Sequence, residues 1–272
     1  ALLGFDGVCA NSMDAVSTRD FMREAVAAMG QTVATAAGIA TDLVGAAGRG
    51  HVTIADAYAS TSSIMPQKVN PDSLELVRAA AGSIQGAQTA IAAIVTGLPR
   101  AYNRDLQAAT PHLWTAVDAT EAVDVTAGAV ATMRVDTAAL AAAAAGGFST
   151  ATGVADTLAM AGIPFRAAHH IVAEVAAATD DPDVATIMDA VAAAAPAHAD
   201  AVDAAAVAAA LDPAASVAAR DSPGGPAPAE TERALEAAEA ALTTARAAHA
   251  ARAEQLADAA AERAAAVASL TT

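Results

Sequence analysis

The chain has 272 residues and a formal net charge of −16 at pH 7, from 30 acidic side chains against 14 basic ones. Because a negative surface repels phosphate groups, neither nucleic acid nor an anionic membrane is expected as a partner. Charged residues interrupt the apolar stretches, so no membrane-spanning helix is predicted. Cys9 is the single cysteine, which excludes an intrachain disulfide and fits a reducing, cytoplasmic compartment.

Lysine is nearly absent, since arginine supplies 13 of the 14 basic residues and Lys68 is the other one. Acidic side chains with so little lysine predict a protein adapted to concentrated salt, which screens the repulsion between like charges. A genome rich in G and C would explain the abundant alanine but not the acidity. Alanine favours helix and buries little area, so we expect long, closely packed helices supported by partner subunits.

Two long helices are predicted in the first half of the chain. The first follows Ser17 as its N-cap and ends near Gly45, and the second follows Asn70 as its N-cap, with Pro71 at its first position. Residues 45–70 are expected to form a loop between them. The apolar stripe of the first helix is expected at Phe21, Ala25, Met29, Val33, Ala36, Ala40 and Leu43.

Shorter helices and turns are predicted in the second half. A third helix follows the stretch GLPRAYNRDLQ (97–107), and a last long helix is expected from Glu230 to about Leu270. No stretch is a convincing strand, so the predicted fold class is all-α.

A domain boundary is predicted where Gly146 and Gly147 interrupt the helical pattern. Residues 1–145 are assigned to a long-helix bundle, and residues 146–272 to a smaller helical C-terminal domain.

The stretch TSSIMPQKVNP (61–71) places Ser62, Ser63, Lys68 and Asn70 in a loop that leads directly into a predicted helix N-terminus. Such an end presents unpaired N–H groups and a partial positive charge. With a lysine and two hydroxyls, it predicts a carboxylate- or phosphate-binding site. The alternative is a solvated loop with an ordinary helix cap.

Several motifs resemble known enzymes. SSIMPQKVNPDSLE (62–75) is similar to the signature of the fumarase/aspartase superfamily, G-S-S-x-M-P-x-K-x-N-P-x-x-x-E. Further stretches resemble one family within it, the argininosuccinate lyases: NSMDAVSTRDF (11–21), QKVNPDSLEL (67–76), GLPRAYNRDLQ (97–107), GFSTATGVADTLAMAGIPFRAAH (147–169) and SVAARDSPGGPAP (216–228). The resemblance implies a long-helix bundle and the reversible elimination of argininosuccinate to arginine and fumarate, a step of arginine biosynthesis.

The resemblance also implies roles for the residues of the signature. Ser62 would be the general base that removes a proton beside a carboxylate, and Lys68 would stabilise the doubly charged aci-carboxylate that forms. Ser63 and Asn70 would bind the substrate. Glu75 would orient a partner residue, because it lies inside the following helix.

The stretch GLPRAYNRDLQ supplies two further candidates by resemblance. Tyr102 and Gln107 would bind the carboxylate or the arginine portion of the substrate. No cofactor is implied, and no metal-ligand spacing is present in the sequence. The family assembles as a homotetramer whose active sites are shared between subunits, so we expect this chain alone to be catalytically incomplete.

Some features depart from the family. Thr61 stands in place of a glycine, Val69 in place of a lysine, and Thr110 in place of a substrate-binding lysine. None of the six histidines lies in the T-H-x-Q-like motif that carries the catalytic histidine, so an upstream part of the usual enzyme is expected before Ala1.

Two alternatives therefore stay open. The first is another fumarate-releasing lyase of the fumarase, aspartase or adenylosuccinate lyase kind. The second is a non-catalytic helical assembly protein on the same fold, as in the lens proteins of this superfamily.

Overall fold

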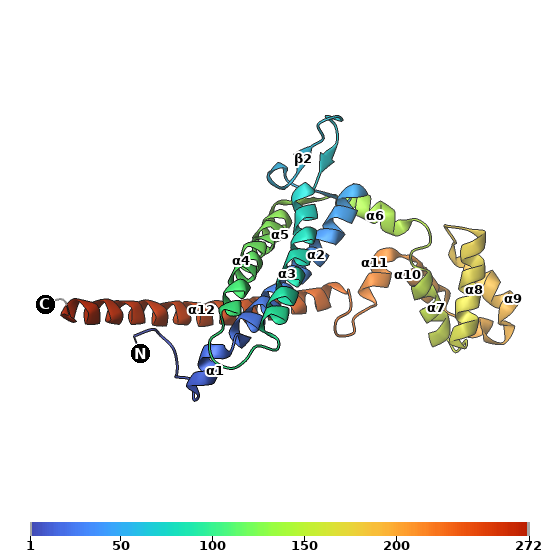
Figure 1. Ribbon diagram of the computed structural model, residues 1–272. Coiled ribbons are helices and arrows are strands. Elements are labelled where there is room, and N and C mark those ends of the chain that lie inside the picture. Colours follow the sequence, from blue (N-terminus) through green and yellow to red (C-terminus); the bar gives the residue numbers. More distant parts are fainter. Residues whose placement is uncertain (1, 271–272) are drawn as a thin grey trace. The chain divides into compact units, whose positions relative to one another are not determined.

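A computed structural model describes residues 2–270, which divide into two compact units with separate hydrophobic cores (Figure 1). The bundle unit comprises residues 7–140, and the C-terminal unit comprises residues 141–270 together with residues 2–6. Helices dominate both units, and the strands of the described chain are two residues long. The predicted all-α fold is confirmed.

Long helices lying side by side build the bundle unit, in which α2 packs on α3, and α3 packs on α4 and α5 (Figure 1). Its elements are α1 (Ser12–Ser17), α2 (Asp20–Gly48), β1 (Val52–Thr53), η1 (Asp56–Tyr58), β2 (Ser60–Thr61), β3 (Val69–Asn70), α3 (Asp72–Val95), η2 (Arg104–Ala108), α4 (Ala109–Ala119), α5 (Glu121–Thr132) and β4 (Arg134–Val135). The predicted third helix is thus interrupted at Thr120, between α4 and α5.

The apolar stripe of α2 begins one residue later than predicted. Its first three buried positions are Met22, Val26 and Gly30, whereas Phe21 is 60% exposed. From Val33 onward the predicted stripe is confirmed. Gly30 belongs to the stripe because a Cβ there would lie 3.1 Å from Cγ2 of Ile84 on α3, so glycine permits the close approach of the two helices.

Neither predicted N-cap is correct. Ser17 ends α1, and its hydroxyl donates to the carbonyls of Met13 and Asp14, because a serine inside a helix bonds back to the preceding turn. Asn70 lies in β3, where its backbone is committed to strand pairing, and Pro71 occupies the N-cap position of α3 without a side-chain hydrogen bond.

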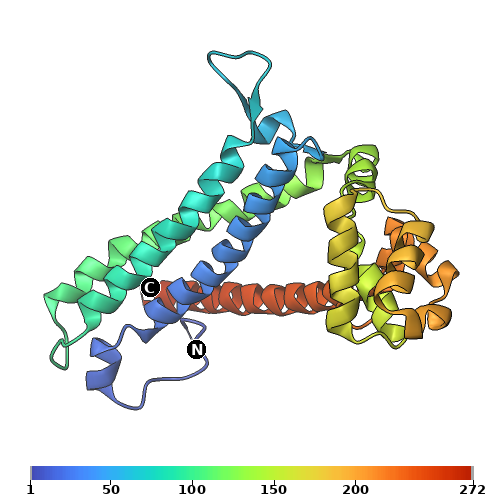
Figure 2. The ribbon, with the colours of Figure 1, turned by 90° about the vertical axis from the view of Figure 1, so that its right-hand side faces the viewer.

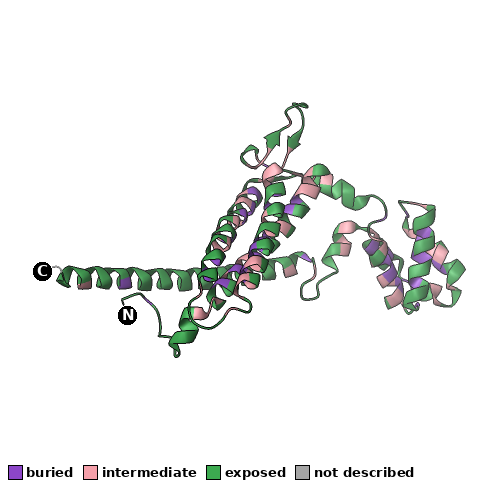
Figure 3. Cartoon of the chain, viewed as in Figure 1, coloured by how far each residue is buried: buried purple, intermediate pink, exposed green. Residues whose placement is uncertain are grey.

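A cluster of short helices and one long helix form the C-terminal unit. α6 (Thr137–Ala145) leads into it, and its further elements are α7 (Ala151–Met160), α8 (Phe165–Ala178), α9 (Val184–Ala194), η3 (Pro196–Ala201), α10 (Ala204–Leu211), α11 (Pro213–Ala218) and α12 (Pro228–Leu270). The core lies among α7–α10, whereas α12 is exposed along most of its length (Figure 3). Ala259 is the single buried residue of the described part of α12. The assignment of residues 1–145 and 146–272 to two domains of a larger enzyme stays a prediction.

Residues 2–270 contain no helix that is both long and apolar enough to cross a membrane.

Candidate functional site

The signature loop, residues 61–70, begins and ends in a two-stranded antiparallel ladder. Ser60 pairs with Asn70, and Thr61 pairs with Val69. Beyond these pairs the N–H of Ser62 donates to the carbonyl of Lys68 at 2.9 Å, and the N–H of Lys68 donates to the carbonyl of Met65 at 2.9 Å. Backbone pairing therefore holds Ser62 beside Lys68, although six positions separate them in the sequence.

Two backbone donors point at the hydroxyl of Ser62. The N–H of Ile64 lies 3.3 Å from Oγ, and the N–H of Met65 lies 3.2 Å from it. Donors aimed at an oxygen favour negative charge on it, which is what a serine needs to act as a base. These two donors were not predicted from the sequence. The serine could have indicated them, since a serine in a turn commonly accepts N–H groups from residues two or three positions later.

Lys68 is exposed, and no acidic side chain of the described chain forms an ion pair with it. Ser63 is also exposed, and Ile64 is 86% exposed at the tip of the loop. The Lys68 ammonium group and the Ser63 hydroxyl are thus on exposed residues, within reach of an anionic ligand, whereas Ser62 is half-buried.

The other two residues of the signature lie at the base of the loop. Asn70 is partly buried in β3. Glu75 is exposed in the first turn of α3, where its carboxylate lies 3.9 Å from the guanidinium of Arg78. A pair this exposed adds little stability, so the carboxylate is available to another partner.

The second group of predicted residues follows the end of α3. Nε2 of Gln107 donates to the hydroxyl of Tyr102 at 3.0 Å, so the two candidates do lie together, and Tyr102 is 55% exposed. Just before them, Ala101 has φ +70°, a conformation that only glycine adopts without strain. The amide of Asn103 bridges this turn by donating to the carbonyls of Pro99 and Ala101.

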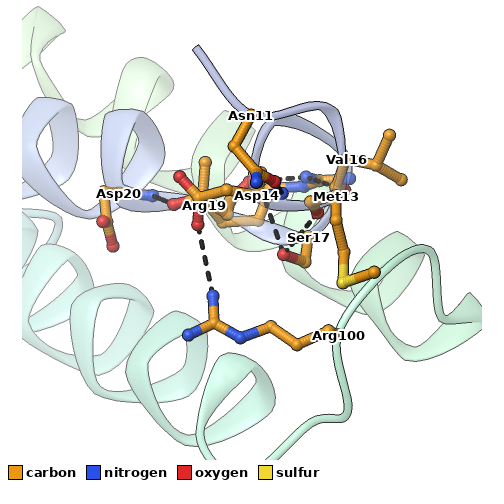
Figure 4. Close-up of polar contacts among 9 residues, drawn as sticks. Asn11, Met13, Asp14, Val16, Ser17, Arg19, Asp20 and Arg100 are labelled. Carbon is orange, nitrogen blue, oxygen red and sulfur yellow. Dashed lines mark hydrogen bonds and ion pairs between the residues drawn. The ribbon is translucent and has the colours of Figure 1, made fainter. Parts of the chain in front are cut away.

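An ion pair connects this turn to α1, a contact that the sequence analysis missed. Nη1 of Arg100 lies 3.2 Å from Oδ1 of Asp14, and the side chain of Asn11 caps α1 by accepting the N–H of Asp14 at 3.0 Å (Figure 4). Two motifs that are far apart in the sequence, NSMDAVSTRDF and GLPRAYNRDLQ, therefore meet in the bundle unit. Nothing in the spacing of these residues signals the contact.

One chain does not bring the two groups of candidates together. The signature loop precedes α3 and the turn that follows α3 lies at its other end (Figure 2). The helix has 24 residues, which makes it about 36 Å long. A single site that uses both groups must therefore draw them from different copies of the chain.

No group of three or more His, Cys, Asp or Glu side chains within residues 2–270 is placed to hold a metal ion.

Comparison with known proteins gives consistent matches in both units. The family described as Lyase matches residues 1–86, and the family described as Argininosuccinate lyase C-terminal matches residues 148–218. Argininosuccinate lyase of Halobacterium salinarum is 56% identical over 255 residues, which cover 89% of this chain and 52% of that protein. The enzymes of Natronomonas pharaonis and Methanosarcina acetivorans are 59% and 45% identical over 66% and 70% of this chain, and over 37% and 40% of their own length.

Solved structures share the fold. EDDS lyase in complex with formate superimposes with a TM-score of 0.87 at 28% identity, over 98% of this chain and 55% of that one. A class II fumarase from Schistosoma mansoni, with a TM-score of 0.53 at 13% identity over 72% of this chain and 41% of that one, is similar in fold alone. The chain spans about half the length of the curated argininosuccinate lyase from Halobacterium salinarum. In its sequence motifs, its two family matches and its fold, the chain belongs to the argininosuccinate lyase family.

Proposed function

We propose that the protein containing this chain catalyses the elimination of arginine from argininosuccinate with release of fumarate, as a step of arginine biosynthesis in the cytoplasm. The observation that carries the proposal is the pairing of Ser62 with Lys68 across the base of an exposed loop, with two N–H donors directed at the serine oxygen. The names of the curated relatives support the choice of substrate.

The first step removes a proton from the carbon beside a carboxylate. Ser62 in its anionic form takes this proton, and the N–H groups of Ile64 and Met65 stabilise the anion before the transfer. The electron pair of the broken C–H bond moves into the neighbouring carboxylate, which becomes a doubly charged aci-carboxylate. A positive group must lie beside it, and Lys68 provides one in this loop.

The second step breaks the carbon–nitrogen bond. The electron pair of the aci-carboxylate forms the double bond of fumarate, and the bond to the guanidinium nitrogen of arginine breaks with its electrons on nitrogen. This nitrogen takes up a proton from an acid outside the signature loop. Tyr102 and Gln107 of a neighbouring copy would hold the substrate during this step, because within one chain they lie beyond the opposite end of α3.

Assembly into a homotetramer with shared active sites is part of this proposal. An apolar groove of about 690 Å³ lies between α2 and α5, and the side chains of Ile39 and Val130 in it are 42% and 41% exposed. We assign this groove to helices of a second copy, since the separation of the two residue groups requires copies to meet along the bundle unit.

A second candidate is a lyase that releases fumarate from a different amino compound. The similarity to EDDS lyase, a variant of which has a structure with bound fumarate, favours it. Val69 and Thr110 each stand where the family has a lysine, and they are the residues expected to change substrate choice.

The test is a serine substitution in the complete protein, assayed with a panel of N-substituted aspartates in strong salt. Ser62→Ala should abolish fumarate release while the assembly stays intact by size-exclusion chromatography. Ser83→Ala, at an exposed position of α3, is the matched control and should retain activity. Unchanged turnover in Ser62→Ala would contradict the assignment of the base, and release from a panel member other than argininosuccinate would favour the second candidate.

A further inference from the structure

Tyr58 connects the base of the signature loop to α5. Its ring lies against Gly128, where an added Cβ would come within 2.6 Å of Cζ and 3.2 Å of Cε1, with the phenol oxygen nearer still. Tyr58 is partly buried and packs on the hydrophobic core of the bundle unit. Only glycine, which has no Cβ, fits at this position while the ring of Tyr58 keeps its place.

Glycine at this position is unexpected from local preference. It lies inside a helix between Ala127 and Ala129, in a chain that uses alanine freely, and alanine is the better helix former. A glycine in such a place is explained by the close approach of another group, and here that group is the ring of Tyr58.

The backbone of Tyr58 is held at the junction of the two ends of the loop. Tyr58 is the last residue of η1, one residue separates it from β2, and its carbonyl accepts a hydrogen bond from the hydroxyl of Ser73 in the first turn of α3. β2 enters the signature loop, and β3, which leaves it, is joined to α3 by Pro71. Both ends of the loop are therefore tied to this tyrosine.

We propose that Gly128 is a positioning residue: its missing side chain makes the space that fixes Tyr58, and Tyr58 sets the placement of the ladder that presents Ser62 and Lys68. The proposal rests on the function proposed above for the signature loop. Neither Gly128 nor Tyr58 needs to touch the substrate, because the effect passes through the backbone from Tyr58 to β2 and from Ser73 to β3.

The experiment uses the complete protein in strong salt, with Gly128→Ala compared to Gly86→Ala. Gly86 is an exposed glycine of α3, and an added Cβ there meets no atom within 4 Å. Gly128→Ala should lower kcat by about tenfold or more with a smaller change in KM, since small misplacements of reacting groups are costly. Gly86→Ala should leave kcat unchanged. A Gly128→Ala protein that melts earlier but keeps the kcat of the wild type would overturn the proposal.

A double-mutant cycle separates the positioning effect from simple destabilisation. Tyr58→Ala removes the ring, so adding Gly128→Ala to it should cause little further loss of kcat. Equal losses from Gly128→Ala in both backgrounds would show that the ring is not the cause. If Gly128→Ala does not fold, Tyr58→Ala by itself must still lower kcat, and normal turnover in that variant counts against the proposal.

Hydrogen exchange tests the placement of the loop without any substrate. The N–H groups of Ser62 and Lys68 are bonded within the loop, so their exchange should be faster in Gly128→Ala than in Gly86→Ala. Faster exchange in a protein that is inactive on argininosuccinate would support the positioning role while contradicting the proposed substrate. Unchanged exchange with normal activity would overturn the positioning role alone.

Discussion

At the scale of single residues, the chemistry proposed for the signature loop would account for the one lysine in a chain that otherwise uses arginine. A compact ammonium group can sit beside a serine and an aci-carboxylate, whereas a planar guanidinium places its charge further out and spreads it over three nitrogens. Lys68 is exposed and is held next to Ser62 by backbone hydrogen bonds, so its identity is not set by packing. The chemistry proposed for the loop is what requires it.

Lys68→Arg should therefore inactivate the complete protein while keeping its charge. Fumarate release should fall by about 100-fold or more, the range seen when a group that stabilises a developing anion is lost. Arg166→Lys, an exchange between the same two residue types at an exposed position of α8, should have no effect. Full activity of Lys68→Arg would show that any positive charge suffices there.

At the same scale, the candidate residues could be predicted by type but not by geometry. The signature singles out Ser62, Lys68 and Asn70 as candidates because its pattern is long and specific. It did not predict that Asn70 lies in a strand, because pairing with Ser60 is a contact across ten residues that local helix-cap preference cannot register. The contact between Asp14 and Arg100 also depends on how the bundle folds and has no local signal.

At the scale of secondary-structure elements, apolar periodicity predicted the long helices well and their first turns poorly. α2 carries two neighbouring apolar rows near its start, one through Phe21 and one through Met22, and periodicity cannot choose between them. The row through Met22 is the buried one. It contains Gly30, whose missing Cβ lets α3 approach closely. The two-residue strands could not be predicted, since such short segments show no alternation.

Helix caps give a test in the C-terminal unit. Asp183 caps α9 by accepting hydrogen bonds from the hydroxyl and the N–H of Thr186, at 2.6 and 2.8 Å, and these bonds lower the pKa of the carboxyl group below its usual value. Because the pKa of Asp183 is lower in the folded chain than in the unfolded one, its cap stabilises the fold fully when the pH is above the ordinary aspartate pKa. This stabilisation is lost as the pH falls through the lowered pKa of the folded chain. Asp183→Ala should lower the melting temperature at neutral pH, by an amount that shrinks in acid.

Asp181→Ala is the matched control for the cap. It removes the same charge two residues away, where the aspartate side chain is exposed and caps no helix. Equal melting curves for the two variants at neutral pH would show that charge, and not the cap, sets the difference.

At the scale of the whole molecule, the length of α3 keeps the two groups of candidate residues apart within one chain. The loop with Ser62 and the turn with Tyr102 lie beyond opposite ends of a helix of about 36 Å, within one compact unit. Active sites shared between copies follow directly from this distance if both groups act on one substrate.

Mixed assemblies test the sharing. Ser62→Ala and Tyr102→Ala should each be inactive, but assemblies formed from both should regain activity, with about one quarter of their sites free of either substitution. Ser62→Ala mixed with Lys68→Ala should not recover, because both changes lie in the same loop. Recovery in neither mixture would mean that one chain supplies the whole site.

The charge of the whole molecule makes a further prediction. With a net charge of −16, the folded chain repels itself, and salt screens this repulsion. The melting temperature should rise steadily between low salt and molar potassium chloride. A melting temperature independent of salt would contradict adaptation to concentrated salt.

The central claim is the reaction, and the most direct measurement is fumarate release from argininosuccinate by the complete protein in strong salt. The account predicts equimolar fumarate and arginine, and none of either product from Ser62→Ala. A folded, assembled protein that releases no fumarate from argininosuccinate would contradict the assigned reaction, and Val69 and Thr110 would then be the first positions to examine for a different substrate.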